Sequence, residues 1–206
     1  MLILYKKTFA LIFILYLQSG SYISNEWDLA IEREGIRVYL HQNWKENSTY
    51  KAEGVVDVPQ NQLYAFLSDI KNYPHWINGC MFTRVLYSNS ELHYRYYATY
   101  DLPWPLRNRD AVADLTIRKL PDGKILATIQ AIDTDTLQSG EYVRETNFSE
   151  KYELIPEEQT TILRMQGSYT TSAYLPDWVI KKFLTWGPYD TFLSIRKASA
   201  KYEPTK

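Results

Sequence analysis

The 206-residue sequence contains a single cysteine and almost no excess charge. Because Cys80 has no second cysteine to pair with, an internal disulfide is excluded. Its neighbours Ile77, Met81 and Phe82 predict a small buried residue instead of a nucleophile. A formal net charge of −1 gives no electrostatic basis for binding nucleic acid, so we expect no partner of that kind.

Recognisable catalytic and cofactor motifs are also missing. His41, His75 and His93 lie far apart, with no His-x-x-x-His or Cys-x-x-Cys spacing that would ligate a metal. There is no Gly-x-Ser-x-Gly motif and no glycine-rich phosphate or nucleotide fingerprint. We therefore expect no cofactor, no metal and no catalytic residue of a familiar type.

The apolar run near the N-terminus is too short to cross a bilayer. Lys6 and Lys7 precede a stretch from Thr8 to Leu17 of about 10 residues, against the ~20 that a spanning helix needs. Small residues follow, as in a cleaved secretory signal. We expect residues 1–24 to be a signal peptide and residues 25–206 an exported domain, periplasmic or extracellular. The alternative is an uncleaved N-terminal anchor, which the apolar residues ahead of the lysines favour.

Hydrophobic periodicity divides the rest of the chain into strands and two helices. Helical spacing predicts a short helix between Pro59 and Pro74, and a long amphipathic helix over Asp177–Lys201. Alternating residues between turn signals predict a series of strands. These are Ile36–His41, Thr49–Val58, Met81–Tyr87, Leu92–Tyr100, Asp110–Lys119, Lys124–Asp133, Thr146–Ile155 and Thr160–Ser172.

This order of elements predicts one α+β domain. Consecutive strands with short connections form an antiparallel meander, and a single long helix would cover the concave side of such a sheet. A strongly curved sheet wrapped around one helix leaves an internal hydrophobic tunnel between them. The alternative is that the helix packs closely against the sheet and fills this space.

Strand parity assigns small and aromatic side chains to the inner face of the sheet. Small residues such as Ala98, Ala113 and Ala127 leave volume that a solid core would fill. Tyr94 and Tyr96 combine an apolar ring with a hydroxyl group that could orient a ligand. The predicted tunnel lining is Tyr94, Tyr96, Ala98, Ala113, Leu115, Ile129, Tyr152, Phe183 and Trp186.

Glu150 is the exceptional polar residue on this face. It shares strand parity with Phe148, Tyr152 and Leu154, which directs its side chain inward. An inward carboxyl group is costly unless it is paired. A β-bulge that turns Glu150 outward is an equally good interpretation.

The connection from Asp101 to Asp110 differs from an ordinary hairpin turn. Pro103 and Pro105 fix the backbone around Trp104, and tryptophan prefers the boundary between bilayer and water. The stiff apolar tip predicts a lid or a membrane-contacting probe, unless Trp104 merely caps the end of a core. At the base of the loop, Arg109 and Asp110 are expected to form a structural pair.

Four motifs, in this order, resemble the StAR-related lipid-transfer (START) family. They are Trp27-Asp28-Leu29 leading into Glu34-Gly35-Ile36-Arg37-Val38-Tyr39, then Tyr73-Pro74-His75-Trp76, then Pro103-Trp104-Pro105 with Arg109-Asp110, then Leu175-Pro176-Asp177-Trp178. The resemblance, to a bacterial exported member of the helix-grip superfamily, spans roughly Asn25 to Lys201. It implies a helix-grip fold with an internal tunnel, and it places the loop beside the last helix. A gate would then comprise Trp104, Leu106, Leu175 and Trp178.

The resemblance implies a non-enzymatic protein, and we expect it to be a monomer. It would bind, and transfer or sense, one hydrophobic lipid-like molecule and contact membranes transiently. A cyclase or dehydratase of the same superfamily, acting on an aromatic or polyketide-like substrate, is the alternative. Some sterol-carrying members place an acid and a base opposite each other beside the loop. The corresponding positions here are Tyr96 and Leu115, which argues against a sterol ligand.

Overall fold

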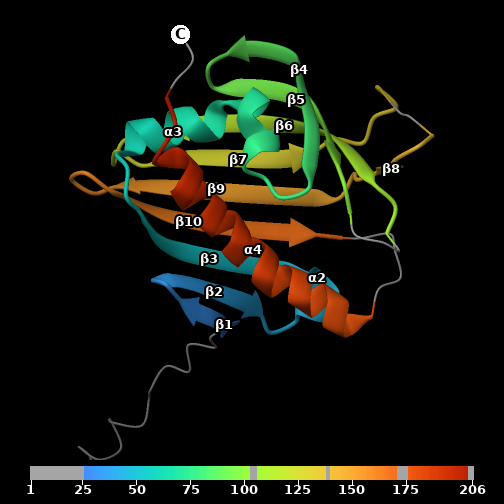
Figure 1. The fold of residues 1–206 in the computed structure, drawn as a ribbon, viewed down its shortest axis with the longest axis horizontal. Helices are drawn as coiled ribbons and strands as arrows, with labels where there is room; N and C mark the ends of the chain where they lie inside the picture. The colour runs from blue at the N-terminus through green and yellow to red at the C-terminus, as the bar shows by residue number, and fades with distance from the viewer. Residues whose placement is uncertain (1–25, 103–105, 138–139, 171–175, 204–206) are drawn as a thin grey trace, which may run out of the picture.

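The computed structural model describes residues 26–102, 106–137, 140–170 and 176–203. The predicted signal peptide, residues 1–24, therefore lies outside the described residues. A ten-stranded sheet makes up most of the described chain (Figure 1). Its order is β1-β2-β3-β10-β9-β7-β6-β5-β4, with β8 beside β6.

All strand pairs in this sheet are antiparallel except β6 with β8, which is parallel. Every strand predicted from the sequence is present, with ends shifted by a few residues. The strands are β1 Trp27–Arg33, β2 Ile36–His41, β3 Thr49–Val56, β4 Cys80–Ser90, β5 His93–Tyr100, β6 Arg109–Lys119, β7 Ile125–Ala131, β8 Val143–Arg144, β9 Phe148–Pro156 and β10 Thr161–Tyr169.

Two strands and one short helix were not predicted. β1 is a mostly exposed edge strand, and the alternation of Trp27, Leu29 and Ile31 in its sequence was not recognised as a strand signal. β8 and the helix α2 (Trp44–Asn47) are too short for periodicity to identify. The predicted helix before Pro74 is divided into α3 (Gln60–Ser68) and the 3-10 helix η1 (Ile70–His75), which contains Pro74.

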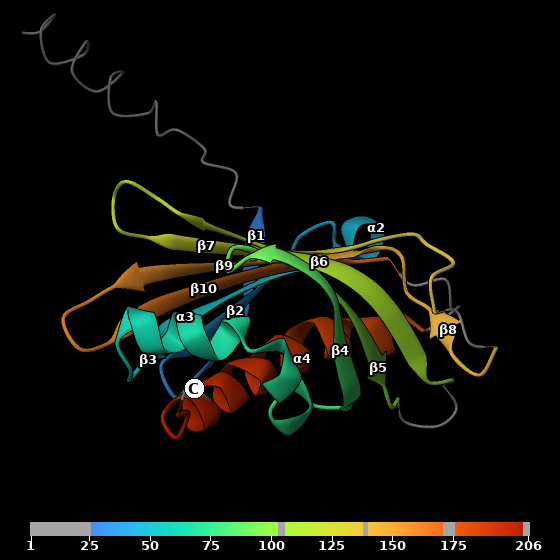
Figure 2. The same cartoon turned by 90° about the horizontal axis from the view of Figure 1, so that it is seen from above.

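The long helix α4 (Asp177–Ser199) crosses one side of the sheet diagonally (Figure 1). Seen from above, the sheet arches over α4, and β4 and β5 bend down around it (Figure 2). α3 and η1 lie on the same side as α4 (Figure 2). The predicted α+β arrangement, a curved antiparallel sheet around a C-terminal helix, is confirmed.

The C-terminal half of α4 is fixed closely to β3. Arg196 donates hydrogen bonds of 2.7 Å to the carbonyl oxygens of Val55 and Glu34. Beneath the helix, a Cβ on Gly54 would lie only 3.1 Å from the ring of Phe192. Glycine at this position therefore permits a close approach that any side chain would prevent.

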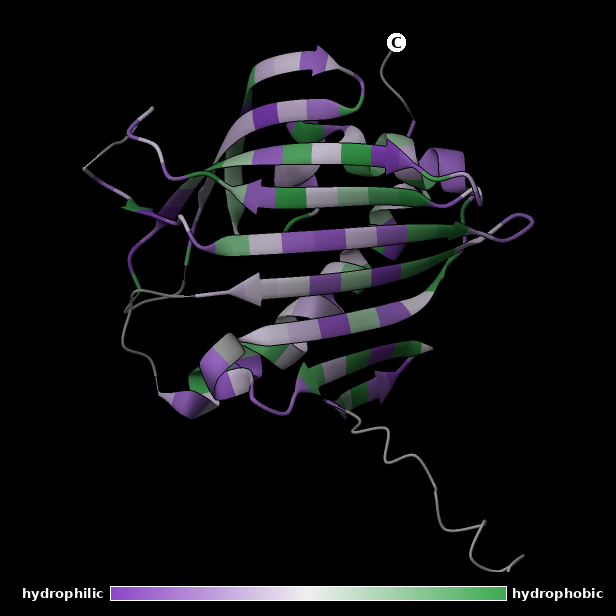
Figure 3. Ribbon diagram, turned by 180° about the vertical axis from the view of Figure 1, so that it is seen from behind, coloured by the Kyte–Doolittle hydropathy of each residue, from purple (hydrophilic) through white to green (hydrophobic). Residues whose placement is uncertain are grey.

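The opposite, convex face of the sheet is not covered by α3 or α4, and polar and apolar residues alternate along its strands (Figure 3). Two hollows of about 400 and 320 Å³ lie on this face. Lys151 and Gln166 line both of them, between other polar and charged side chains. The apolar core lies instead on the concave side, between the sheet and the helices.

Candidate functional site

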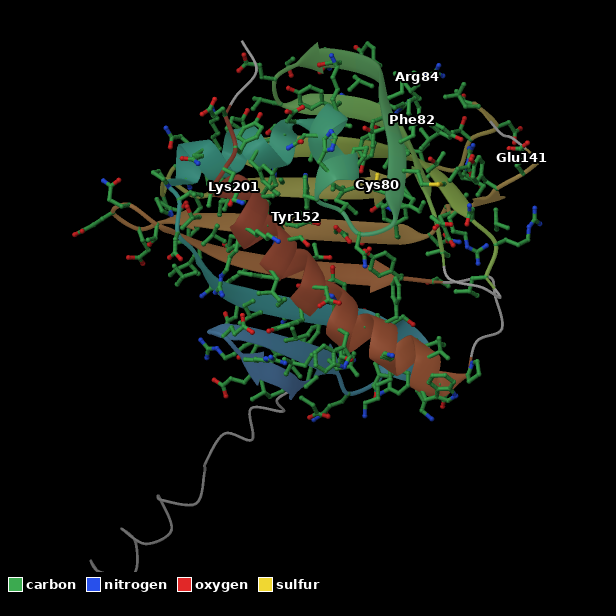
Figure 4. All side chains as sticks on the ribbon, in the orientation of Figure 1. Cys80, Phe82, Arg84, Glu141, Tyr152 and Lys201 are labelled. Carbon is green, nitrogen blue, oxygen red and sulfur yellow. The ribbon has the colours of Figure 1, made fainter. Side chains whose placement is uncertain are left out.

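Most of the predicted tunnel lining lies on the concave face of the sheet. The strand register pairs Tyr96 with Ala113, and Leu115 with Ile129. These side chains share one core cluster with Phe192 of α4. The predicted residues found on this face are Tyr94, Tyr96, Ala98, Ala113, Leu115, Ile129 and Tyr152; Figure 4 labels Tyr152 on β9.

The two α4 residues in the predicted lining are not part of the buried core, and their place in a lining stays a prediction. Phe183 is 58% exposed, with its ring 6.4 Å from that of Tyr169, and Trp186 is 43% exposed. The buried side of α4 instead follows Leu184, Phe192 and Ile195. α4 carries apolar residues on more than one face. Its docking on β3 through Phe192 and Arg196 buries the face that contains Leu184, Phe192 and Ile195.

The concave face carries small buried residues beside larger, partly accessible ones. Ala98 and Ala113 are fully buried, whereas several aromatic residues packed beside the same core keep part of their surface accessible. The partly accessible residues on this face are Tyr94, Tyr100, Phe148, Glu150 and Tyr169.

Glu150 points inward. The register of β9 with β10 runs from Phe148 to Pro156 without a shift, so no bulge turns the residue outward. Glu150 is therefore on the same face as Tyr152, and the inward interpretation is the correct one. Its carboxyl group is paired, although with neutral groups and not with a cation.

Tyrosine hydroxyl groups surround the Glu150 carboxyl group. Tyr50 and Tyr169 donate to Oε1, with Tyr50 at 3.5 Å, and Tyr152 donates to Oε2. Gly167 lies opposite both Tyr50 and Glu150 in the sheet. A Cβ on Gly167 would lie 2.3 Å from the Tyr50 ring, so the missing side chain lets Tyr50 reach across β10.

Burial controls the protonation of this cluster. It raises the pKa of Glu150, and hydrogen bonds from Tyr152 and Tyr50 only partly offset the rise. Burial, reinforced by the nearby Glu150 carboxyl group, also holds the pKa of Tyr50 and Tyr152 well above the ordinary value. The phenols therefore stay neutral donors at physiological pH.

The other buried titratable groups near this face are also uncharged. Burial raises the pKa of Tyr73, Tyr96 and Tyr100, and that of Cys80 to about 11. Tyr73 donates its hydroxyl hydrogen to the Leu67 carbonyl oxygen at 2.9 Å. Cys80 is buried, as predicted, and its thiol is protonated at neutral pH.

Arg109 and Asp110 do not pair with each other, which corrects the prediction. As neighbours on β6 they point to opposite faces, and each pairs with a residue at or beside β8. The Arg109 Nε lies 3.1 Å from Glu145 Oε1, and the Arg144 Nε lies 2.9 Å from Asp110 Oδ1. Tyr97 adds a hydrogen bond of 3.2 Å to Asp110. Both residues are buried and structural at the base of the loop, as expected.

Only part of the predicted gate can be described. Leu106 is half-buried, and Trp178 is 70% exposed in the first turn of α4. Trp104 and Leu175 lie outside the described residues. Over the described part of the chain, no helix is long and apolar enough to cross a membrane, and the same residues contain no cluster of metal-ligating side chains.

The positions used to argue against a sterol are not neighbours across the strands. Leu115 lies opposite Tyr94, and Tyr96 lies opposite Ala113. The sequence reasoning also missed Tyr50 and Tyr169 as partners of Glu150. Gly167 was the available signal, because a glycine inside a strand often marks the close approach of another group.

Three comparisons relate this architecture to known proteins. Residues 56–184 match the family described as polyketide cyclase / dehydrase and lipid transport. An uncharacterised protein of Pseudomonas aeruginosa is 27% identical over 187 residues, covering 89% of this chain and 91% of that protein. The structure of a STAR-related lipid transfer protein from Xanthomonas axonopodis matches with a TM-score of 0.78 at 21% identity, covering 85% of this chain and 99% of that one.

The aromatase/cyclase Zhui from Streptomyces sp. R1128 matches less completely. Its TM-score is 0.56 at 10% identity, covering 74% of this chain and 93% of that one. Both structural matches share the curved sheet and the C-terminal helix, and at these identities they support the fold alone. With its START-type helix-grip fold and a family match over most of its length, the chain belongs to the polyketide cyclase / dehydrase and lipid transport family.

Proposed function

We propose that the protein is a non-catalytic carrier that holds one hydrophobic, lipid-like molecule between α4 and the concave face of the sheet. The supporting observation is that this face places buried alanines beside half-buried aromatic residues such as Tyr94 and Phe148. Apolar walls with a few polar groups are the usual composition of a site for a hydrophobic molecule. Transfer between membranes, or sensing, would follow from binding.

Mass spectrometry of an organic extract from the natively purified protein tests this proposal. We expect a lipid-like component at close to one molecule per chain. Replacing Ala98 and Ala113 together by leucine should fill the space, and the extracted component should then decrease. Thr116→Leu, on the convex side of β6, is the matched control and should change nothing. If no hydrophobic molecule is extracted and apolar probes do not bind, the protein is not a carrier.

The second candidate is a cyclase or dehydratase, and Glu150 is the observation that favours it. A carboxyl group whose pKa is raised by burial is suited to general acid or base catalysis. The three histidines are poorer candidates, because none belongs to the buried core. His93, for example, lies on the other face beside Asp114 at 3.5 Å.

Variants distinguish the two candidates. Replacing His41, His75 and His93 together by glutamine should leave ligand binding intact under either proposal. A polyketide-like substrate that the native protein converts to product, and that Glu150→Gln no longer converts, would establish the enzyme. Loss of such an activity in the triple histidine variant would make the cyclase depend on histidine instead.

We also propose that the ligand enters and leaves at a membrane, past the loop 103–106 and the start of α4. The exposed Trp178 supports this, because its ring could move from water into the bilayer interface. Trp104→Ala with Leu106→Ser should slow transfer of ligand between vesicles and leave the affinity in solution unchanged. Equal transfer rates would show that this loop is not the gate.

Export to the periplasm or the extracellular space remains part of the proposal. Lys6, Lys7 and the short apolar run behind them support it. N-terminal sequencing of protein made in its natural host tests it. A mature chain that starts near Asn25 is expected, whereas a full-length chain in the membrane fraction would favour the anchor.

A further inference from the structure

Within the described part of the chain, Glu150 has no counter-charge. Its hydrogen bonds come from neutral phenols, and the groups that shift its pKa, apart from burial, are tyrosines. Among the described residues no lysine, arginine or histidine forms an ion pair with it. The three internal gaps at 103–105, 138–139 and 171–175 contain none of these residue types either. A desolvated carboxylate without a cation is costly, so its presence calls for an explanation.

The surroundings of Glu150 are also unusual for a purely structural carboxyl group. Enough protein atoms surround it for burial to raise its pKa, yet the residue keeps part of its surface accessible. Aromatic rings extend the cluster: Tyr169 lies 6.2 Å from Tyr50 and 6.0 Å from Phe148, measured between ring centroids. A negative group beside several aromatic rings attracts a cation both by charge and through the ring faces.

We propose that Glu150, with Tyr50, Tyr152 and Tyr169, forms the head-group subsite of the proposed ligand site and takes a ligand that bears an ammonium group on an apolar chain. This inference rests on the proposed carrier function. The phenols orient the carboxylate oxygens, and the ammonium group supplies the missing positive charge and a further hydrogen-bond donor. An anionic head group would be repelled. A neutral alcohol could also donate a hydrogen bond to the carboxylate, but it would leave the negative charge uncompensated.

The test compares ligands of one chain length that differ only in head group. Dodecylamine, dodecanol and dodecanoate are titrated calorimetrically into the full mature chain at neutral pH, below their aggregation concentrations. Dihexanoyl phosphatidylethanolamine, a zwitterionic aminolipid, forms a further arm and shows whether the ammonium group comes from a single-chain amine or from a lipid. We expect an ammonium ligand to bind at least 10-fold more tightly than the alcohol, and dodecanoate to bind most weakly.

Two substitutions on β9 locate the origin of this preference. Glu150→Gln keeps the shape and the hydrogen-bond acceptor, and should reduce amine affinity to that of the alcohol while leaving the alcohol unchanged. Glu153→Gln makes the same change of charge on the convex face, where Glu153 lies 3.4 Å from Arg164, and should preserve the preference. If Glu150→Gln does not fold, Glu150→Met tests the same loss with an apolar side chain of similar length.

The outcomes separate the two proposals. If dodecanol binds but ammonium ligands have no advantage, the subsite is wrong and the carrier function stands. An ammonium preference that survives in Glu150→Gln, or in Glu150→Met, also overturns the subsite. If none of the apolar ligands binds the native protein, the carrier function fails and the subsite fails with it.

Discussion

Two regions of this molecule bury ionisable side chains, and they differ in whether an opposite charge lies nearby. At the base of the loop, Asp110 is held by Arg144 at 2.9 Å, and Arg109 lies 3.1 Å from Glu145. On the concave face, the hydrogen-bond partners of the Glu150 carboxyl group among the described residues are tyrosines. The first region contains equal numbers of buried acids and bases, and the second contains an acid alone.

Under the proposal above, this difference separates a structural role at the loop base from a ligand-binding role at Glu150. Arg144 also donates to the carbonyl oxygens of Thr134 and Thr136, so its charge ties β6, β8 and the connection between β7 and β8 together. Each of these charged groups lies beside one of opposite sign, although the buried Arg109 Nε forms no hydrogen bond. Glu150 is satisfied in hydrogen bonds but not in charge. A site that must receive a charged ligand needs such an imbalance, at some cost to the stability of the unliganded protein.

The largest expected effect comes from breaking the balanced region. Asp110→Ala leaves the buried Arg144 without its partner, and we expect the free energy of unfolding to fall by about 3–5 kcal/mol. Asp114→Ala is the matched control on the same strand. It removes an ion pair with Arg95 near the convex surface, where about 0–1 kcal/mol is expected. Urea denaturation measures both, and similar costs would show that burial does not distinguish the two pairs.

The next effect comes from crowding the unbalanced region. Gly167→Ala places a Cβ 2.3 Å from the Tyr50 ring, which must move away from Glu150. We expect a loss of about 1–3 kcal/mol in the free energy of unfolding, typical of overpacking. Gly140→Ala, where a Cβ meets nothing within 4 Å, is the control. In a double-variant cycle with Tyr50→Ala, the cost of Gly167→Ala should largely disappear, and an unchanged cost would place the strain elsewhere.

A smaller effect is expected from the charge of Glu150 itself. Because its pKa in the folded protein lies above the ordinary value of 4.5, the folded state binds more protons than the unfolded state between these two values. The contribution of Glu150 to stability is therefore fully present below pH 4.5 and is lost as the pH rises through the folded-state pKa. Glu150→Gln should abolish this dependence.

Chemical denaturation at pH 5 and pH 8 measures this dependence. From pH 5 to pH 8, the free energy of unfolding of Glu150→Gln should rise by roughly 1 kcal/mol relative to that of the native protein. This is the low end of the cost of an uncompensated buried polar group. The groups that face the carboxyl group are the phenols of Tyr50, Tyr152 and Tyr169, and burial keeps the first two neutral over this range by raising their pKa. Glu153→Gln should follow the native profile. A native profile that coincides with that of Glu150→Gln would mean that Glu150 stays ionised throughout.

The contrast between the two regions also shows how far sequence reasoning could go. Strand parity was sufficient to put Ala113, Leu115 and Tyr152 on the inner face, because alternation is a local property. The partners of Glu150 were not accessible in this way. Tyr50 lies 100 residues before Glu150 in the chain, and only the pairing of β3, β10 and β9 brings them together.

Two differences between prediction and structure, the partners of Arg109 and Asp110 and the buried face of α4, have the same origin. Arg109 and Asp110 are adjacent in sequence, yet a strand sends adjacent side chains to opposite faces and each finds a partner near β8. For α4, the sequence carries apolar residues on several sides. Which side is buried depends on the fit of Phe192 against Gly54, a contact between distant segments.

The smallest effect on stability is expected at the exposed start of α4. Trp178 is 70% exposed, so Trp178→Ala should change the free energy of unfolding by no more than about 0.5 kcal/mol.

The effect of Trp178→Ala on the free energy of membrane binding should be larger than its effect on stability. Removing a ring that could bury apolar area in the interface, at ~25 cal/mol per Å², costs on the order of 1 kcal/mol or more, a several-fold loss of vesicle binding. Cosedimentation with vesicles measures this loss. Trp27→Ala, at the far edge of the sheet on β1, is the control and should bind vesicles as the native protein does. If both variants bind equally well, membrane contact does not involve this end of α4, and the proposed route of ligand entry past it is wrong.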